Sequence, residues 1–112
     1  MIAARGVYTA ALLALASGCA SAQDALTEQA LRARSLAATC AACHGTDGRA
    51  AAGASLPGLA GMPAATLAEQ LKAFKSGARA GTVMPQLAKG YSDAQIEQLA
   101  AWFEKARHKA AP

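Results

Sequence analysis

The stretch Cys40-Ala41-Ala42-Cys43-His44 decides how the rest of the chain is interpreted. A C-x-x-C-H sequence is typical of covalent haem attachment, because two thiols three residues apart can form thioethers with the two vinyl groups of one porphyrin. The histidine that follows directly is then carried beneath the ring, where it binds the iron. We therefore predict one covalent haem c, attached through Cys40 and Cys43, with His44 as an axial ligand.

Three other kinds of site use cysteines at this spacing. A thioredoxin-like redox pair lies in a βαβ context, which this sequence lacks. A zinc site needs further Cys or His ligands, and only Cys19 and His108 remain in the chain. A disulfide between Cys40 and Cys43 is compatible with an exported protein, but it explains neither His44 nor the long loops of the chain.

Three residues are candidates for the second axial ligand. Met84 lies in a long loop, and the following Pro85 restricts the backbone that delivers its flexible side chain. Met62 is better explained as a packing residue at the entry to a helix, and His108 as a solvated residue of a charged tail. We predict His44 and Met84 as the axial pair, a combination that raises the reduction potential. Met84 argues against an open sixth position of the kind that a peroxidase needs.

The N-terminal end has the pattern of an export signal. Arg5 supplies a positive charge, and the apolar stretch 7–16 is too short to span a bilayer. The small residues that end at Ala22 match a signal-peptidase site. Residues 1–22 are therefore predicted to be a signal peptide, and residues 23–112 a single domain.

A lipid anchor at Cys19 is the alternative to cleavage after Ala22. The residues before it are close to a bacterial lipoprotein box, although the usual leucine three positions before the cysteine is absent. In both cases we expect a periplasmic protein without a transmembrane segment.

Composition sets two further limits. The chain has 112 residues, is rich in alanine and is only 4% aromatic, so its own core is thin and the haem-free chain is predicted to be largely unfolded. A net charge of +4, without a run of Lys or Arg, does not indicate nucleic-acid binding.

Helical periodicity appears three times, and no stretch alternates with the period of a strand. The first predicted helix covers about 27–42 and leads into the cysteine motif. The second covers about 63–76, with Pro63 in its first turn and Gly77 just past its end. The third begins at Ser92, where a Ser-x-x-Gln sequence forms a capping box. These elements predict an all-α fold.

The helices carry apolar stripes and are separated by long irregular segments. The stripe of the second helix comprises Leu67, Leu71 and Phe74, and that of the third comprises Ile96, Leu99 and Phe103. The polar side of the second helix comprises Glu69, Gln70, Lys72 and Lys75. Segments 45–62 and 78–91 are rich in Gly and Pro, and loops of this length are usually functional, so we expect them to wrap the haem.

The run 36–45, Met84-Pro85 and the final aromatic helix together resemble the class I cytochromes c, over nearly all of residues 23–103. This resemblance implies a small fold of three to four helices around one covalently bound haem, with the first and last helices crossing. It also implies a loop proline whose carbonyl accepts a hydrogen bond from the axial imidazole. Pro57 corresponds to that residue, with Pro63 as the other candidate.

Three stretches, 55–63, 70–77 and 82–86, resemble the cytochrome subunit of flavocytochrome c sulfide dehydrogenase, here in a monohaem version. This resemblance implies that electrons come from a flavoprotein dehydrogenase subunit with FAD and leave to a downstream cytochrome or oxidase. It also implies an electron-transfer protein that is not an enzyme on its own. The same stretches resemble free soluble cytochromes, so a carrier between respiratory complexes is the alternative.

Four basic residues have two interpretations. They are Arg49, Lys75, Arg79 and Lys89. They either ring an exposed haem edge near Cys40 and Cys43 and steer partner proteins, or form an ordinary solvated basic face.

Overall fold

The computed structural model describes residues 22–106, and all regular secondary structure within this range is helical, which confirms the all-α prediction. The signal peptide up to residue 21, Cys19 and His108 lie outside the described residues. The chain divides into two units between Arg32 and Ala33, and each unit is described by itself.

In the first unit, residues 22–32 are helical. Two contacts between residues one turn apart support this helix. The Thr27 hydroxyl donates to the carbonyl of Gln23 at 3.0 Å, and Arg32 forms an ion pair with Glu28.

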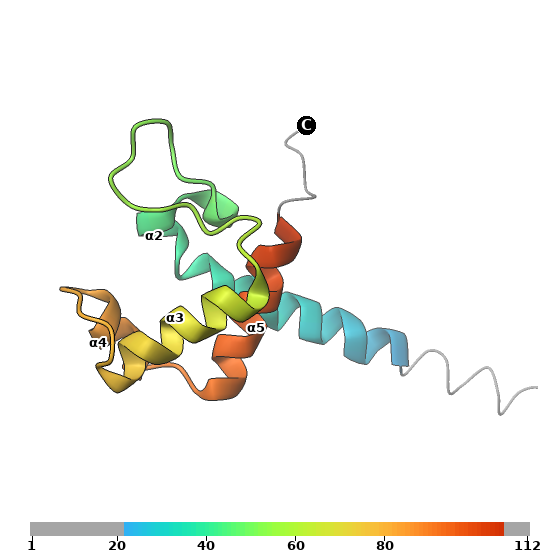
Figure 1. Ribbon diagram of the computed structural model, residues 1–112. Helices are drawn as coiled ribbons and strands as arrows, with labels where there is room; N and C mark the ends of the chain where they lie inside the picture. The colour runs from blue at the N-terminus through green and yellow to red at the C-terminus, as the bar shows by residue number, and fades with distance from the viewer. Residues whose placement is uncertain (1–21, 107–112) are drawn as a thin grey trace, which may run out of the picture. The chain divides into compact units, whose positions relative to one another are not determined.

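The second unit begins with helical residues 33–38 and then contains four helices and one short 3₁₀ turn. Their bounds are α2 (Ala41–His44), η1 (Thr46–Gly48), α3 (Ala64–Ser76), α4 (Met84–Lys89) and α5 (Asp93–Ala106). Figure 1 shows α4 beside the C-terminal half of α3, and α3 also packs against α5. Helix α3 is therefore the central element of this unit.

The apolar stripes of α3 and α5 form the core, as their periodicity predicts. Leu67 and Leu71 of α3 are buried with Ile96, Leu99 and Phe103 of α5. Burial of each of these large side chains contributes about 2 kcal/mol. Helix α3 therefore owes its position mainly to apolar contacts with α5.

Both helices begin with a side-chain cap. The Ser92 hydroxyl accepts a hydrogen bond from the N–H of Gln95 at 3.2 Å, and the Gln95 side chain accepts one from the N–H of Ser92 at 2.8 Å, which confirms the predicted capping box. At the start of α3, the carboxylate of Glu104 accepts a hydrogen bond from the N–H of Ala64 at 2.9 Å. This second cap comes from α5 and has no local sequence signal.

Three predictions of helix extent are wrong. Residues 22–26, which precede the predicted first helix, are already helical. The first helix ends at residue 38, and a turn at 39–40 separates it from α2. Segment 78–91, predicted to be irregular, contains helix α4. Pro85 lies in the first turn of α4, where its fixed φ suits a helix and its missing N–H has no intrahelical partner to lose.

Backbone hydrogen bonds fix the loop between η1 and α3. The carbonyl of Gly48 accepts hydrogen bonds from the N–H groups of Leu59 at 2.8 Å and Ala60 at 3.1 Å. The N–H of Gly61 donates to the carbonyl of Phe103 at 2.7 Å. The bonds to Gly48 close the base of the loop that carries Pro57, and the bond from Gly61 holds this base against α5.

Gly48 lies where this loop meets Phe103, and we expect Gly48→Ala to lower the free energy of unfolding by about 3 kcal/mol. Its φ is +73°, and an added Cβ would lie 2.8 Å from the buried Phe103 ring and 3.0 Å from the backbone nitrogen of Ala60. Gly53→Ala is the matched control, because Gly53 has a φ of +77° but nothing within 4 Å of an added Cβ. In urea unfolding of the haem-loaded proteins, Gly53→Ala should lower the free energy of unfolding by only about 1 kcal/mol. Equal losses of free energy in Gly48→Ala and Gly53→Ala would contradict the steric argument.

Candidate haem site

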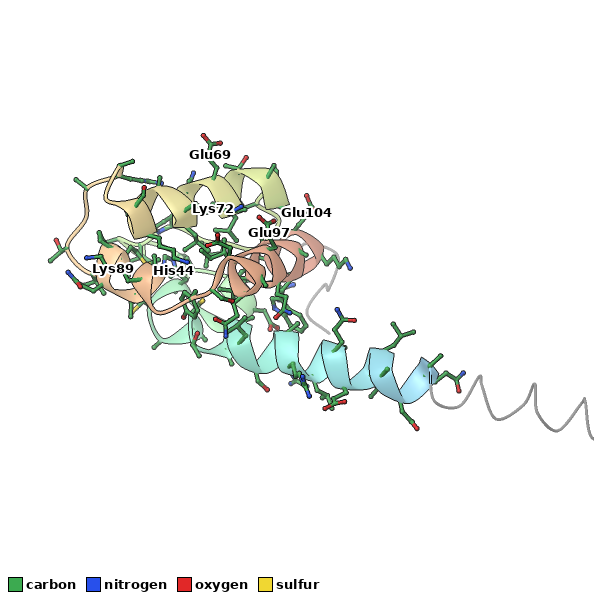
Figure 2. All side chains as sticks on the ribbon, turned by 90° about the horizontal axis from the view of Figure 1, so that it is seen from below. His44, Glu69, Lys72, Lys89, Glu97 and Glu104 are labelled. Atoms are coloured by element: carbon green, nitrogen blue, oxygen red, sulfur yellow. The ribbon has the colours of Figure 1, made fainter. Side chains whose placement is uncertain are left out.

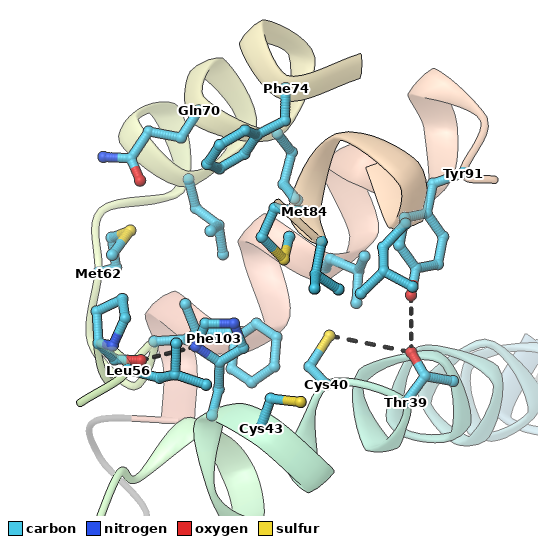
Figure 3. Close-up of a pocket in the computed structure, with 18 of the residues that line it drawn as sticks. Thr39, Cys40, Cys43, Leu56, Met62, Gln70, Phe74, Met84, Tyr91 and Phe103 are labelled. Carbon is cyan, nitrogen blue, oxygen red and sulfur yellow. Dashed lines mark hydrogen bonds between the residues drawn. The ribbon is translucent and has the colours of Figure 1, made fainter. Parts of the chain in front are cut away.

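The two cysteines lie on the same side of a single helical turn. Helix α2 follows Cys40 directly, and the N–H of His44 donates to the carbonyl of Cys40 at 3.0 Å. Residues three apart on a helix are neighbours, so the side chains of Cys40 and Cys43 project together, as Figure 3 shows. Both thiols are free, so the alternative of a disulfide between them is not formed.

A cavity of about 360 Å³ lies against these thiols. Its volume is within the usual range for cofactor and ligand sites. Its walls come from the loop before α3, from α3, from α4 and from α5, and they are mainly apolar. The walls include Leu56, Leu59, Leu67, Leu71, Leu99 and Phe103.

His44 is buried at the wall of this cavity, and its ring orientation is set by Pro57. The ring nitrogen Nδ1 lies 2.7 Å from the carbonyl oxygen of Pro57. A carbonyl oxygen can only accept, so Nδ1 carries the proton and donates. The other nitrogen, Nε2, therefore keeps its lone pair for a metal, the tautomer that an iron ligand requires. Of the two candidate prolines, Pro57 is the one that makes this contact.

The structure brings two methionines to the same cavity. Met84, the first residue of α4, and Met62, just before α3, both line it. In Figure 3, Met84 lies across the cavity from Cys43, and Met62 lies at a separate edge. Cys40, Cys43, His44 and Met84, which sequence analysis selects, thus converge on one space.

A hydrogen-bonded chain closes the cavity beside Cys40. The Thr39 hydroxyl lies 2.7 Å from the carbonyl of Leu36 and 2.9 Å from the hydroxyl of Tyr91. Since Thr39 donates its one proton to the carbonyl, Tyr91 donates to Thr39. Burial raises the pKa of the Cys40 thiol.

Sequence analysis missed Thr39 and Tyr91 and misplaced Gln70. Thr39 and Tyr91 are 52 residues apart, and no spacing rule pairs them. Gln70, assigned to the polar side of α3, is half-buried and lines the cavity.

The residues present fit a haem better than a zinc ion. Two neighbouring thiols, an imidazole with an available Nε2 and a thioether surround an apolar cavity, which is the donor set of a haem c site. Within residues 22–106, no three His, Cys, Asp or Glu side chains lie close enough together to bind a metal ion. The described part of the chain therefore offers no ligand set for zinc.

Two ion pairs join α3 to α5 beside the site. Lys72 pairs with Glu97, as Figure 2 shows, and Lys75 donates to Asp93 at 2.8 Å. The ammonium of Lys75 also donates to the carbonyl of Tyr91 at 2.8 Å. Lys75 thus holds the turn between α4 and α5 against α3.

The contact with Lys75 holds the pKa of Asp93 below its usual value. A carboxyl group whose pKa is lower in the folded state stabilises the fold above its unfolded pKa, about 4, and loses this contribution as pH falls through the folded pKa. We therefore expect the stability advantage of the wild type over Asp93→Asn to shrink as pH falls from about 6 to about 2. The difference should be small and should weaken with salt, because both groups are at the surface.

Thermal unfolding of the two haem-loaded proteins across this pH range measures the effect. Glu69→Gln is the matched control, since it removes one carboxylate from α3 without touching Lys75, and Figure 2 shows Glu69 pointing away from the helices. A pH-independent difference between wild type and Asp93→Asn would contradict the assignment.

Comparison with known proteins now identifies the family. Residues 27–103 match the family model described as cytochrome c oxidase, cbb3-type, subunit III. The chain is 41% identical over 68 residues to cytochrome c-554(548) of Halomonas halodenitrificans, which covers 58% of this chain and 81% of that protein. The chain belongs to the cytochrome c family. Haem c is the cofactor of this family.

Other relatives of this cytochrome carry names from sulfur metabolism. It is 43% identical over 76 residues to a thiosulfate dehydrogenase electron acceptor of Thiomonas intermedia, covering 68% of this chain and 35% of that protein. It is 38% identical over 72 residues to the cytochrome subunit of sulfide dehydrogenase of Chlorobaculum tepidum, covering 64% of each. The cytochrome thus spans about a third of the first relative. No helix within residues 22–106 is long and apolar enough to cross a bilayer.

Proposed function

We propose that this cytochrome holds one haem c through thioethers to Cys40 and Cys43, with His44 and Met84 as axial ligands, and transfers single electrons. One observation carries the proposal: these four residues, from two separate segments, line the same apolar cavity. The C-x-x-C-H motif occurs once in the sequence, which supports a single haem.

The residues of the site have different roles in electron transfer. Haem supplies a one-electron couple between ferric and ferrous iron when it is bound. His44 presents Nε2 while Pro57 holds its ring, so the ligand needs no reorientation when the charge changes. Buried apolar side chains such as Leu67 and Leu99 exclude water from the cavity. We propose an electron-transfer protein that is not an enzyme on its own.

The donor we propose is a dehydrogenase that oxidises a reduced sulfur compound. Relatives named as electron acceptors of thiosulfate dehydrogenase and as a cytochrome subunit of sulfide dehydrogenase support this class of donor. A flavoprotein subunit with FAD is the form that the sequence resemblance implies, and a downstream cytochrome or oxidase would accept the electrons. A freely diffusing carrier is the second candidate, supported by the similarity to cytochrome c-554(548), most of whose length the chain covers.

Purification from the native host without a tag tests the partner. Absorbance of every fraction is recorded for haem and for flavin, through a wash at high salt, and the fractions are assayed with sulfide and with thiosulfate. Flavin that stays with the haem at a fixed ratio would support a flavoprotein dehydrogenase subunit. Haem alone, in a small monomeric fraction, would favour the diffusing carrier, because transient partners dissociate in salt.

We also propose export to the periplasm with removal of residues 1–22. The intact mass of the protein from a periplasmic fraction should equal residues 23–112 plus one haem. A lipid-modified chain that begins at Cys19 would instead establish the membrane-anchored alternative. A cytoplasmic protein that retains residues 1–22 would contradict export.

A further inference from the structure

The segment between α3 and α5, residues 77–92, carries Met84 and is anchored mainly to α3. Helix α4 packs against α3, and the ammonium of Lys75 on α3 donates to the carbonyl of Tyr91 at 2.8 Å. These contacts fix the position of Met84 relative to α3. Neither of them joins the segment to the part of the chain that carries the cysteine motif.

One hydrogen bond links this segment to the cysteine side of the cavity. The hydroxyls of Tyr91 and Thr39 lie 2.9 Å apart, and Thr39 directly precedes Cys40. Figure 3 shows this bond at the edge of the cavity, beside Cys40. Within residues 22–106, it is the only hydrogen bond or ion pair between segments 33–62 and 77–92.

Both partners of this bond are held in place by further contacts. The ring of Tyr91 is half-buried, lines the cavity and packs against the apolar core, while Lys75 binds its carbonyl. Thr39 donates its proton to the carbonyl of Leu36 at 2.7 Å, which leaves its oxygen free to accept from Tyr91. The bond therefore joins two well-fixed points, the turn before Cys40 and the start of α5.

This arrangement controls how easily Met84 can leave the iron of a bound haem. For Met84 to withdraw from the cavity, segment 77–92 must move away from the cysteine side, and this movement breaks the bond between Tyr91 and Thr39. The bond therefore stabilises the closed state, in which Met84 faces the cavity. Its loss raises the population of the open state, in proportion to the free energy that the bond contributes.

We propose that Thr39 and Tyr91 are positioning residues that keep Met84 on the iron, and that breaking their bond exposes the sixth position to small ligands. The inference rests on the proposed function, because it needs a haem with His44 and Met84 as axial ligands. The two hydroxyls act through the segment that delivers Met84 and not through contact with the iron.

The test measures the affinity of the ferric, haem-loaded protein for imidazole, followed by loss of the charge-transfer absorption of sulfur-ligated haem. Imidazole binds only molecules in which Met84 has left the iron, so its apparent affinity rises with their population. Tyr91→Phe keeps the ring and removes the donor, and Thr39→Val keeps the shape and removes the acceptor. Each should raise the affinity about fivefold, which corresponds to the net contribution of one hydrogen bond.

Three further variants separate the bond from other effects. Thr39→Ser keeps the hydroxyl and should bind imidazole as the wild type does. The double variant Tyr91→Phe/Thr39→Val should show about the same fivefold rise as either single variant, because both changes remove one bond. Gly53→Ala controls for general loss of stability, since Gly53 does not line the cavity, and its imidazole affinity should not change.

Imidazole affinities of Tyr91→Phe and Thr39→Val equal to that of the wild type would overturn the positioning role and leave the haem ligation intact. A rise of about 25-fold in the double variant would also overturn it, because independent effects multiply. The same rise in Gly53→Ala would assign the effect to general instability and reject the bond as its cause. If Tyr91→Phe does not mature, Thr39→Val against Thr39→Ser decides in the same way. A wild type without sulfur-ligated absorption would instead show that the proposed axial pair fails.

Discussion

Replacing Cys40 and Cys43 together by alanine should leave the chain largely unfolded. Without an attached haem, the cavity of about 360 Å³ has nothing to fill it. The apolar walls of the cavity then lose the packing that a haem would give them, and a small domain has only about 5–15 kcal/mol of total stability.

The composition of the core adds to this expectation. Among the buried side chains of the described residues, several are alanines, such as Ala68, Ala88 and Ala100, which bury little apolar surface. The walls made by Leu67, Leu71 and Leu99 face the cavity, so they lose their main packing partner when it is empty. Far-ultraviolet circular dichroism and urea titration of the variant measure the outcome.

Wild-type chain produced in a host that lacks haem attachment is the matched control. It keeps both thiols but has no cofactor, and it should be as unfolded as the double alanine variant. Agreement of the two would assign the effect to the missing haem and not to the missing thiols. A helical haem-free chain that melts cooperatively would show that the protein core suffices.

The Met84→Ala variant should lose the charge-transfer absorption of sulfur-ligated ferric haem. Its reduction potential should fall by on the order of 0.1 V or more, because axial ligands and their surroundings set haem potentials over about 0.8 V. The fall follows from the chemistry of the thioether, which raises the potential when it binds the iron opposite a histidine. Absorption spectra and potentiometric titration of the purified protein provide both measurements.

Met62→Ala is the matched control for this prediction. Met62 lines the same cavity and has the same thioether, so the pair separates ligation from simple loss of cavity packing. The control should keep the sulfur-ligated spectrum. The reverse pattern would make Met62 the ligand, and an unchanged spectrum in both variants would leave the sixth position open to catalysis at the haem.

Sequence reasoning succeeded where the physical cause is local. The cysteine spacing, the stripe of Leu67 and Leu71, and the capping box at Ser92 all involve residues within about two helical turns of one another. Each of these patterns is reproduced in the structure. Helix α4 was missed because its six residues are too short for a periodic stripe to appear.

By itself the sequence determined the kind of cofactor, the all-α class and the two long helices α3 and α5, because spacing along the chain dictates these features. The tertiary structure alone decided which distant groups meet. It joins Thr39 to Tyr91 and Glu104 to the start of α3, and it selects Pro57 over Pro63 as the partner of His44. It also places Gln70 and Arg79 on the wall of the cavity. Such contacts depend on the paths of the loops and the packing of helices, and these are settled only when the whole chain folds around a common core.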